Sequence, residues 1–271
     1  MWKHCVLWRN VYFFLEVTKI FVDAHTHLKH YENNLSKALE IINEKEIWTL
    51  ACAINKKDYL WLKEIAQNQP FIIPCYGIHP WEINPELEEL NNQEEMLHFI
   101  KETAVIGEIG LDFYWAEDET NYPLQIKTLT FFFESASKYN KVVNLHTKGA
   151  EREILALLKS YQLKTPIIHW YSGPLELIDD FIDLECYWTI SVDITESEKT
   201  RKLVARLPFD KILTETDGPT ALEWVNGHYA YPDYIERIVK EIAKIKEVDS
   251  EFCRRQINDN FRELLAGEVT I

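Results

Sequence analysis

Short apolar runs alternate along the chain with segments in which apolar residues recur every three or four positions. Continuous short runs favour buried strands, whereas the three-and-four spacing favours amphipathic helices. Strands are expected at residues 21–27, 48–54, 71–78, 104–111, 142–146, 167–171, 187–192 and 212–216. Helices are expected at about 35–42, 60–66, 96–100, 124–139, 154–158, 175–182, 199–207, 232–245 and 250–265. Ser250 is the expected N-cap of the last helix.

This alternation predicts a TIM barrel, an α/β fold in which parallel strands are each followed by a helix. The length agrees, because 271 residues with 46% hydrophobic content are enough for one large core. A doubly wound open sheet is the weaker alternative, since neither a glycine-rich dinucleotide motif nor a P-loop follows any expected strand. We therefore expect a single barrel domain over residues 20–271.

Residues 1–19 precede the first expected strand and are predicted to be an N-terminal extension outside the barrel. Arg9 and Asn10 interrupt the apolar stretches, so the segment is too short and too polar to span a membrane, and no small-residue cleavage site follows it. Val17 and Thr18 lead straight into the first strand, and valine can be the internal reading of an alternative start codon. We expect the native chain to start near these two residues.

The formal net charge of −15 at pH 7 argues against a protein that coats long nucleic acid through a broad basic face. A local phosphate pocket that contains metal ions is compatible with this charge. The cysteines form no close C-x-x-C pair and are expected to be reduced packing residues. These features favour a cytoplasmic protein without a membrane segment.

The sharpest chemical signal is the pair His25 and His27 at the end of the first expected strand. Side chains two positions apart in a strand point the same way, so both imidazoles can reach one metal ion. The plainer alternative is two polar residues that enter a turn. Further side chains able to bind metal lie at or near later strand ends, namely Glu108, His146, His169 and Asp217. Because barrel enzymes carry their chemistry at the carboxyl ends of strands, this distribution predicts a two-metal hydrolase.

Separated motifs surround these residues. In chain order they are Asp23-Ala24-His25-Thr26-His27-Leu28, Gly77-Ile78-His79-Pro80-Trp81, Gly107-Glu108-Ile109-Gly110-Leu111-Asp112, Asn144-Leu145-His146-Thr147-Lys148, His169-Trp170-Tyr171-Ser172-Gly173 and Glu215-Thr216-Asp217-Gly218-Pro219. Together, and over residues 20–266, they resemble the TatD family of metal-dependent hydrolases in the amidohydrolase superfamily. The resemblance implies one metal ion held by His25, His27, Glu108 and Asp217. It implies a second held by Glu108, His146 and His169, so that Glu108 bridges the two.

The cofactors implied by this resemblance are two divalent metal ions, with magnesium, manganese and zinc as the candidates. Four imidazoles and two carboxylates suit zinc, manganese, iron or cobalt better than an all-oxygen magnesium cage. Asp217 and Glu108 are the expected catalytic carboxylates. Asp217 would orient the attacking water or take its proton.

Other polar residues near the strand ends have two interpretations each. His79 either closes a turn before Pro80 or contacts a phosphate or a leaving group. Asp112 either contacts a neighbour of the metal site or caps a loop. Glu215 lies on the same strand face as Asp217 and is either a partner of the metal ligands or a buried layer residue. The surface or packing histidines are expected to be His4, His30 and His98, and His228 is left undecided.

Departures from the family pattern concern the substrate more than the chemistry. TatD nucleases usually carry arginine where this chain has Lys148, which binds phosphate as a point charge without a bidentate fork. The basic stretch that usually follows the last aspartate is missing, and residues 220–232 stand in its place. Aromatic residues that follow strand ends could stack on unpaired bases or form a hydrophobic rim or partner surface; they are Trp81, Tyr114, Trp115, Trp170, Tyr171, Trp224 and Tyr229. The predicted substrate-binding residues are His79, Lys148 and Trp170.

The variant motifs at residues 169–173 and 214–219 are similar to those of TatD-like proteins in Qat-type anti-phage defence operons. That similarity implies a bacterial protein that acts with operon partners. The expected function is a metal-dependent DNase that acts on single-stranded or frayed DNA ends. The alternatives are a hydrolase of small amides, esters or lactones, and a defence-complex subunit whose main role is to recognise a partner protein.

Overall fold

The computed structural model describes residues 20–116 and 118–269, so the predictions about residues 1–19 lie outside the described part. Parallel strands form the centre of the molecule. They are β1 (Phe21–Thr26), β2 (Ile47–Cys52), β3 (Ile72–Cys75), β4 (Val105–Gly110), β5 (Val142–His146), β6 (Lys164–Ile168), β7 (Tyr187–Ile190) and β8 (Ile212–Thr214).

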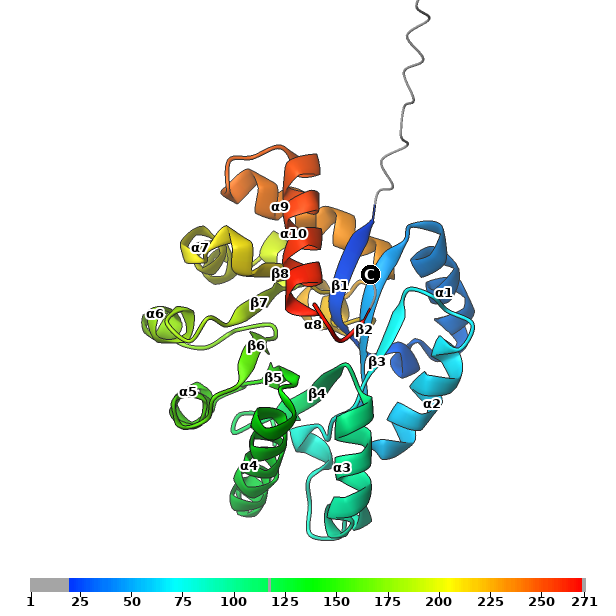
Figure 1. The fold of residues 1–271 in the computed structure, drawn as a ribbon. Helices are drawn as coiled ribbons and strands as arrows, with labels where there is room; N and C mark the ends of the chain where they lie inside the picture. The colour runs from blue at the N-terminus through cyan, green and yellow to red at the C-terminus, as the bar shows by residue number, and fades with distance from the viewer. Residues whose placement is uncertain (1–19, 117, 270–271) are drawn as a thin grey trace, which may run out of the picture.

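The strands close into a barrel in chain order. Pairing runs β1-β2-β3 and β4-β5-β6-β7-β8, and a parallel bridge between Tyr76 and Ile106 joins the two sets. Across the remaining seam, Thr214 Oγ1 donates to the Val22 carbonyl at 2.6 Å, and the Asp217 amide donates to the His25 carbonyl at 3.0 Å. Figure 1 shows the helices arranged around the outside of this ring. The predicted TIM barrel is confirmed.

The helices of the described part alternate with the strands. The α-helices are α1 (Leu35–Glu44), α2 (Lys56–Ala66), α3 (Gln93–Glu102), α4 (Tyr122–Tyr139), α5 (Glu151–Ser160), α6 (Ile178–Ile182), α7 (Glu198–Arg206), α8 (Ala221–Asn226), α9 (Ile235–Ile245) and α10 (Ser250–Leu264). Short 3-10 segments span Leu28–Asn34, Pro80–Glu82, Glu88–Asn91, Glu119–Asn121, Leu175–Leu177, Val192–Thr195, Phe209–Lys211 and Pro232–Tyr234. The expected helices at 175–182 and 232–245 therefore each begin with a 3-10 turn.

Several helices are longer than predicted, as α2, α3 and α5 show, and the start of α10 and the whole of α8 differ in other ways. The N-cap of α10 is Asp249 and not Ser250, because the Asp249 carboxylate accepts the amide hydrogens of Glu251 and Phe252 at 2.8 and 3.3 Å. A carboxylate there also interacts favourably with the positive end of the helix. Helix α8 was not predicted at all, since its length of 6 residues is too short to show helical periodicity.

Strand β6 begins and ends earlier than predicted. The expected strand at 167–171 placed Trp170 and Tyr171 in the sheet, whereas β6 covers Lys164–Ile168 and the chain turns at Trp170, with φ of 32°. The first residue of β6, Lys164, is charged and was therefore not predicted to lie in a strand. In the structure its ammonium group pairs with Glu268, far along the chain, at 3.5 Å. A sequence window around β6 does not contain that partner.

Helix α10 contacts the starts of the strands and leaves their carboxyl ends free. The Ile20 carbonyl, just before β1, accepts hydrogen bonds from Arg254 at 2.6 Å and from Asn258 at 2.7 Å. Asn260 donates to the Ile212 carbonyl at the start of β8, at 2.8 Å.

In the described part of the chain, no helix is both long and apolar enough to cross a membrane. The described cysteines are all buried and free of disulfides, as predicted: Cys52, Cys75, Cys186 and Cys253.

Candidate active site

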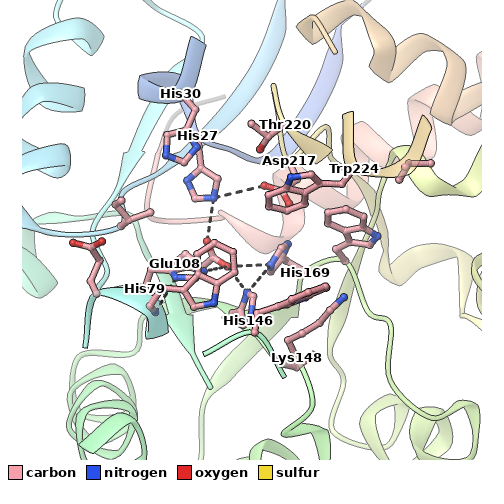
Figure 2. Close-up of a pocket in the computed structure, with 17 residues that line it drawn as sticks. His27, His30, His79, Glu108, His146, Lys148, His169, Asp217, Thr220 and Trp224 are labelled. Atoms are coloured by element: carbon pink, nitrogen blue, oxygen red, sulfur yellow. Dashed lines mark hydrogen bonds and ion pairs between the residues drawn. The ribbon is translucent and has the colours of Figure 1, made fainter. Parts of the chain in front are cut away.

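Six predicted metal ligands converge at the carboxyl ends of the strands, as Figure 2 shows for most of them. Three of them lie in strands, His25 in β1, Glu108 in β4 and His146 at the end of β5. The other three follow strands, His27 after β1, His169 after β6 and Asp217 after β8. All lie on or under one pocket. Strand geometry explains the convergence, because parallel strands of a barrel end on the same face.

The Glu108 carboxylate is the centre of the cluster. Its side chain is buried, and its two oxygens face different imidazoles. Oε2 lies 3.1 Å from His27 Nε2 and 3.4 Å from His25 Nε2. Oε1 lies 2.9 Å from His146 Nδ1 and 3.0 Å from His169 Nε2. Glu108 thus lies between two pairs of ring nitrogens, which is the geometry expected of a carboxylate that bridges two cations; the bridging role itself stays a prediction.

The rings of His25 and His27 are fixed by contacts on their far nitrogens. His25 Nδ1 lies 3.0 Å from Asn144 Oδ1, and His27 Nδ1 lies 3.1 Å from the Cys52 carbonyl oxygen. An oxygen acceptor at Nδ1 makes that nitrogen the proton donor, so the Nε2 lone pair is free to bind a cation. The expectation that both imidazoles of the H-x-H pair point the same way is confirmed by their Nε2 separation of 3.4 Å.

Asp217 completes the side of the cluster that faces β1. Its Oδ1 lies 3.6 Å from His27 Nε2 and 3.8 Å from His25 Nε2. The preceding residue, Thr216, donates from its amide and its hydroxyl to Asp23 at 2.9 and 2.6 Å. Burial raises the pKa of Asp23 to about 7. Asp23 therefore ties β1 to the segment that carries Asp217, a role that its place in the first motif did not reveal.

Both interpretations of Asp112 hold. Its Oδ1 accepts the amide hydrogens of Tyr114 and Trp115 at 2.8 and 2.7 Å, so it caps the loop after β4. Its Oδ2 lies 3.0 Å from His146 Nε2 and accepts from Trp81 Nε1 at 2.7 Å. One buried carboxylate thus joins a candidate metal ligand to three aromatic residues at the pocket rim.

Glu215 is a buried neighbour of a candidate ligand. Its Oε2 lies 3.5 Å from His169 Nδ1. The ring of His169 also stacks on His25, with the centroids 3.9 Å apart. Glu215 is thus a buried residue whose carboxylate faces His169 from behind, so both of its interpretations fit the structure.

Close approach of β4 and β5 brings Glu108 to His146. At Gly110, φ is 154°, and a Cβ atom there would overlap the His146 carbonyl oxygen. Any residue larger than glycine would push the strands apart at this point. The second glycine of the Gly-Glu-Ile-Gly motif is thus required by packing.

The site has the electrostatic character of a cation-binding centre. Burial raises the pKa of Glu108, but the charges of His79, His25 and His169 outweigh it and hold that pKa well below its usual range. Burial lowers the pKa of His169, but the carboxylates of Glu108 and Glu215 outweigh this effect and raise it well above the usual value. The carboxylate is thus ionised in the interior, where a positive partner is required.

The donor set fits metal ions. Ligand atoms of His25, His27 and Glu108 all lie within 4.8 Å of one another, as do those of His79, Glu108 and His146. Glu108 Oε2 is buried and accepts no hydrogen bond from the described residues. Imidazoles and carboxylates, like those around this unsatisfied oxygen, are ligands that divalent metals such as zinc prefer.

A pocket of about 910 Å³ opens above the cluster. All three predicted substrate-binding residues line it. His79 Nδ1 accepts the Trp81 amide hydrogen at 3.1 Å and so closes the turn, while Nε2 lies 3.5 Å from Glu108 Oε1. Lys148 Nζ donates to Ser172 Oγ at 2.7 Å and lies 5.7 Å from the centre of the Trp170 ring.

Sequence reasoning missed part of the pocket lining. His30 was assigned to the surface or to packing and is exposed, but it also lines the pocket, with its ring centroid 5.1 Å from that of His27. Thr220 and Val225 also line it, next to the predicted aromatic residue Trp224. The other described histidines without a predicted role, His98 and His228, are exposed, and His4 lies outside the described residues.

The chain is similar to known metal-dependent hydrolases over nearly its whole length. The family model described as TatD related DNase matches residues 22–266. The metal-dependent hydrolase MJ1582 of Methanocaldococcus jannaschii is 29% identical, with 89% of this chain and 94% of that protein covered. The mouse protein TATDN3, named as a candidate deoxyribonuclease, is 28% identical, with 88% and 86% covered.

Solved structures agree on the fold. The Escherichia coli TatD homologue YjjV superposes with a TM-score of 0.78 at 21% identity, with 91% of this chain and 98% of that chain covered. The family match, the barrel and the buried histidine and glutamate clusters all agree with a metal-dependent hydrolase. The chain belongs to the TatD-related DNase family, and it is a metal-dependent hydrolase.

Proposed function

We propose that this chain is a deoxyribonuclease that hydrolyses phosphodiester bonds in single-stranded DNA or at frayed DNA ends. The observation that carries the proposal is the pocket of about 910 Å³ with ionised Glu108 at its base and Lys148 on its wall. Pockets of about 300–1,000 Å³ take small ligands, so this one admits a nucleotide or two and excludes an intact duplex.

The proposed ligands are those that the sequence predicted. His25, His27, Glu108 and Asp217 would hold one divalent ion, and Glu108, His146 and His169 would hold the second, with magnesium, manganese or zinc as candidates. When bound, such ions lower the pKa of a water molecule and offset the negative charge that develops on the phosphodiester. The described contacts support this set, since Glu108 lies within 3.4 Å of an imidazole nitrogen on each side.

Protein side chains supply the remaining steps. Asp217 borders the pocket beside His27, where its carboxylate orients the attacking water and accepts a proton from it. Lys148 binds a phosphate oxygen, since its ammonium group already lies at the pocket wall within reach of Ser172. Burial lowers the pKa of His79, and this ring contacts the phosphate or the leaving group as a hydrogen-bond partner.

A second candidate is hydrolysis of a small amide, ester or lactone by the same residues. The pocket volume favours it as much as it favours a nucleotide, and the basic stretch typical of TatD nucleases is missing at residues 220–232. The family match of residues 22–266 favours the nuclease. The role in anti-phage defence, the operon partners and the cytoplasmic location stay predictions from the sequence.

The experiment is a comparison of substrates with the wild-type chain. End-labelled single-stranded DNA, the same sequence as a blunt duplex, and p-nitrophenyl esters are each incubated with metal-stripped protein before and after magnesium, manganese or zinc is added. We expect metal-dependent cleavage that is fastest on the single strand. Ester hydrolysis without DNA cleavage would contradict the proposal and favour the small-molecule hydrolase.

A further inference from the structure

Exposed aromatic side chains surround the mouth of the pocket. Trp81, Trp115 and Trp224 line it and are 50%, 58% and 64% exposed. Tyr114, next to Trp115, is 66% exposed and packs edge-on against it with the ring centroids 4.7 Å apart. Large apolar surfaces that stay in water at a pocket mouth mark a place where a ligand binds.

One pair of these rings is already arranged for stacking. The indoles of Trp170 and Trp224 are nearly parallel, at 13°, with their centroids 6.3 Å apart. Trp170 is half-buried at the turn after β6, where its amide donates to Thr189 Oγ1 at 3.4 Å. Trp224 keeps 64% of its surface exposed despite this contact, so a large part of its ring is open to a ligand. Figure 2 shows Trp224 among the residues that line the pocket.

Helix α8 holds Trp224 in this position. Its buried residues Ala221 and Leu222 anchor the helix against the barrel. Gly227 ends it with φ of 80°, a conformation that glycine adopts without strain, and its amide donates to the Glu223 carbonyl at 2.9 Å. The segment that replaces the usual basic stretch thus forms an ordered element that presents an aromatic ring.

Charge limits how this pocket can hold a nucleic acid. Of the lysines and arginines that the structure describes, only Lys148 lines the pocket. The net charge of the chain is −15, so phosphate contacts alone supply little affinity. Lys148 Nζ lies 5.7 Å from the centre of the Trp170 ring, so a phosphate on Lys148 places its nucleoside next to the indole pair.

We propose that Trp224, presented by α8 and stacked with Trp170, is the subsite that holds an unpaired nucleobase next to the phosphate bound at Lys148. This inference rests on the proposed function. A base inside a duplex has neighbours on both faces and cannot stack on an indole, whereas an unpaired base can. Aromatic stacking therefore makes the site select single strands and frayed ends, and it is tolerant of sequence because every base has a flat face.

A protein partner is the competing occupant of the same rings. The exposed indoles border a hollow of about 910 Å³ that descends to His27, Glu108 and Asp217. A hollow that ends in ionisable groups matches a ligand with a flat apolar part and an anionic part. A nucleotide has both, which is why we assign the subsite to a base.

The test is a binding measurement with a single-stranded oligonucleotide that contains 2-aminopurine at successive positions. The full-length chain carries Asp217→Asn so that bound DNA stays intact, and the fluorescence quenching and Kd are recorded. Trp224→Ala and Trp224→Phe are added on this background. Phe252→Ala is the matched control, because Phe252 is a 45% exposed aromatic that contacts Phe209 near the start of β8, away from the pocket.

We expect Trp224→Ala to raise Kd by about 5- to 150-fold and to abolish quenching at one position of the strand. Trp224→Phe keeps most of both signals, and Phe252→Ala changes neither. With an abasic residue at the quenched position, parent and Trp224→Ala chains bind equally. Unchanged binding in Trp224→Ala, or the same loss on the abasic strand, overturns the inference. The inference is also overturned if Trp224→Ala stops the chain from comigrating with a protein partner while its DNA binding stays normal.

Failure of this inference differs from failure of the proposed function. If the wild-type chain cleaves no DNA with any added metal, the nuclease proposal fails, whatever the binding data show. If the wild-type chain cleaves single strands and Trp224→Ala cleaves them at the same kcat/KM, the nuclease proposal stands and the stacking subsite is wrong.

Discussion

Glu108 and Trp224 line the same pocket, but 1% of Glu108 and 64% of Trp224 are exposed to solvent. Glu108 lies on a buried strand with imidazole nitrogens within 3.5 Å on all sides. Trp224 lies on a short helix and contacts Trp170 at the rim. The base of the pocket is thus fixed by many mutual contacts, whereas the rim is fixed by few. We therefore expect the reaction chemistry to depend on the base of the pocket and the choice of substrate to depend on its rim.

The largest effect is expected at the base of the pocket. Glu108→Gln keeps the size of the side chain but removes the charge that faces the imidazoles of His25, His27, His146 and His169. We expect metal content and hydrolysis rate to fall by more than about 100-fold, beyond the 10- to 100-fold typical of residues behind a metal ligand. Metal analysis after dialysis and single-turnover rates measure both. Glu94→Gln, on the exposed face of α3, is the control; equal metal content in the two variants would refute a central role for Glu108.

The next largest effect, on metal affinity, is expected at Asp112, which connects the base of the pocket to its rim. Asp112→Asn keeps an oxygen for the Tyr114 and Trp115 amides but removes the charge that faces His146 Nε2 at 3.0 Å. We expect the metal affinity to fall by about 10- to 100-fold. Metal titration of the stripped protein is the measurement, with Asp118→Asn, an exposed turn-capping residue, as the control. Affinity within twofold of wild type would show that Asp112 only caps the loop.

A smaller effect, on stability, is expected beneath the rim. Burial raises the pKa of Asp193 from 3.8 to about 6, and Thr200 Oγ1 donates to it at 2.5 Å. Because the folded pKa lies above the unfolded one, the folded state binds the proton more tightly, and the wild type loses stability as pH rises from about 4 to about 6. Asp193→Asn should therefore be more stable by up to about 3 kcal/mol at pH 8 and unchanged at pH 3. Urea unfolding at both values tests this; a difference that does not vary with pH would contradict it.

The smallest effect is the response of DNA binding to salt. Lys148 is the one lysine or arginine in the described pocket lining. For single strands, the slope of the logarithm of the binding constant against the logarithm of the salt concentration is about −0.7 for each phosphate that the protein neutralises. We expect the affinity of Asp217→Asn for a short single strand to fall by about two- to threefold between 50 and 200 mM salt. Fluorescence anisotropy measures it. A fall of 100-fold or more would show that a basic surface, and not the indole pair, supplies the affinity.

The sequence predicted the fold and the base of the pocket better than the rim. Strand β5 was predicted with its observed bounds, Val142–His146, because a short run of apolar residues around Asn144 ends there in a histidine. His25 and His27 were predicted to converge because strand periodicity alone fixes their direction. Local patterns were therefore sufficient wherever a strand determines the position of the side chain.

Contacts between distant segments could not be predicted in the same way. Asn144 and the Cys52 carbonyl hold the rings of His25 and His27, but nothing near these histidines in the sequence indicates such partners. His30 was placed on the surface because it has no regular spacing to another ligand, although the turn after β1 brings it to the pocket. Such contacts depend on how neighbouring strands and turns pack, which periodicity does not encode.

We propose that the Glu108-centred cluster performs metal-dependent cleavage of single-stranded DNA. The most direct measurement is the cleavage rate of one end-labelled single strand by wild type and Asp217→Asn, each stripped of metal and then given back magnesium, manganese or zinc. We expect that cleavage by the wild type requires added metal and that Asp217→Asn loses most of the rate. Equal rates in both chains, or cleavage that persists in stripped protein, would contradict it.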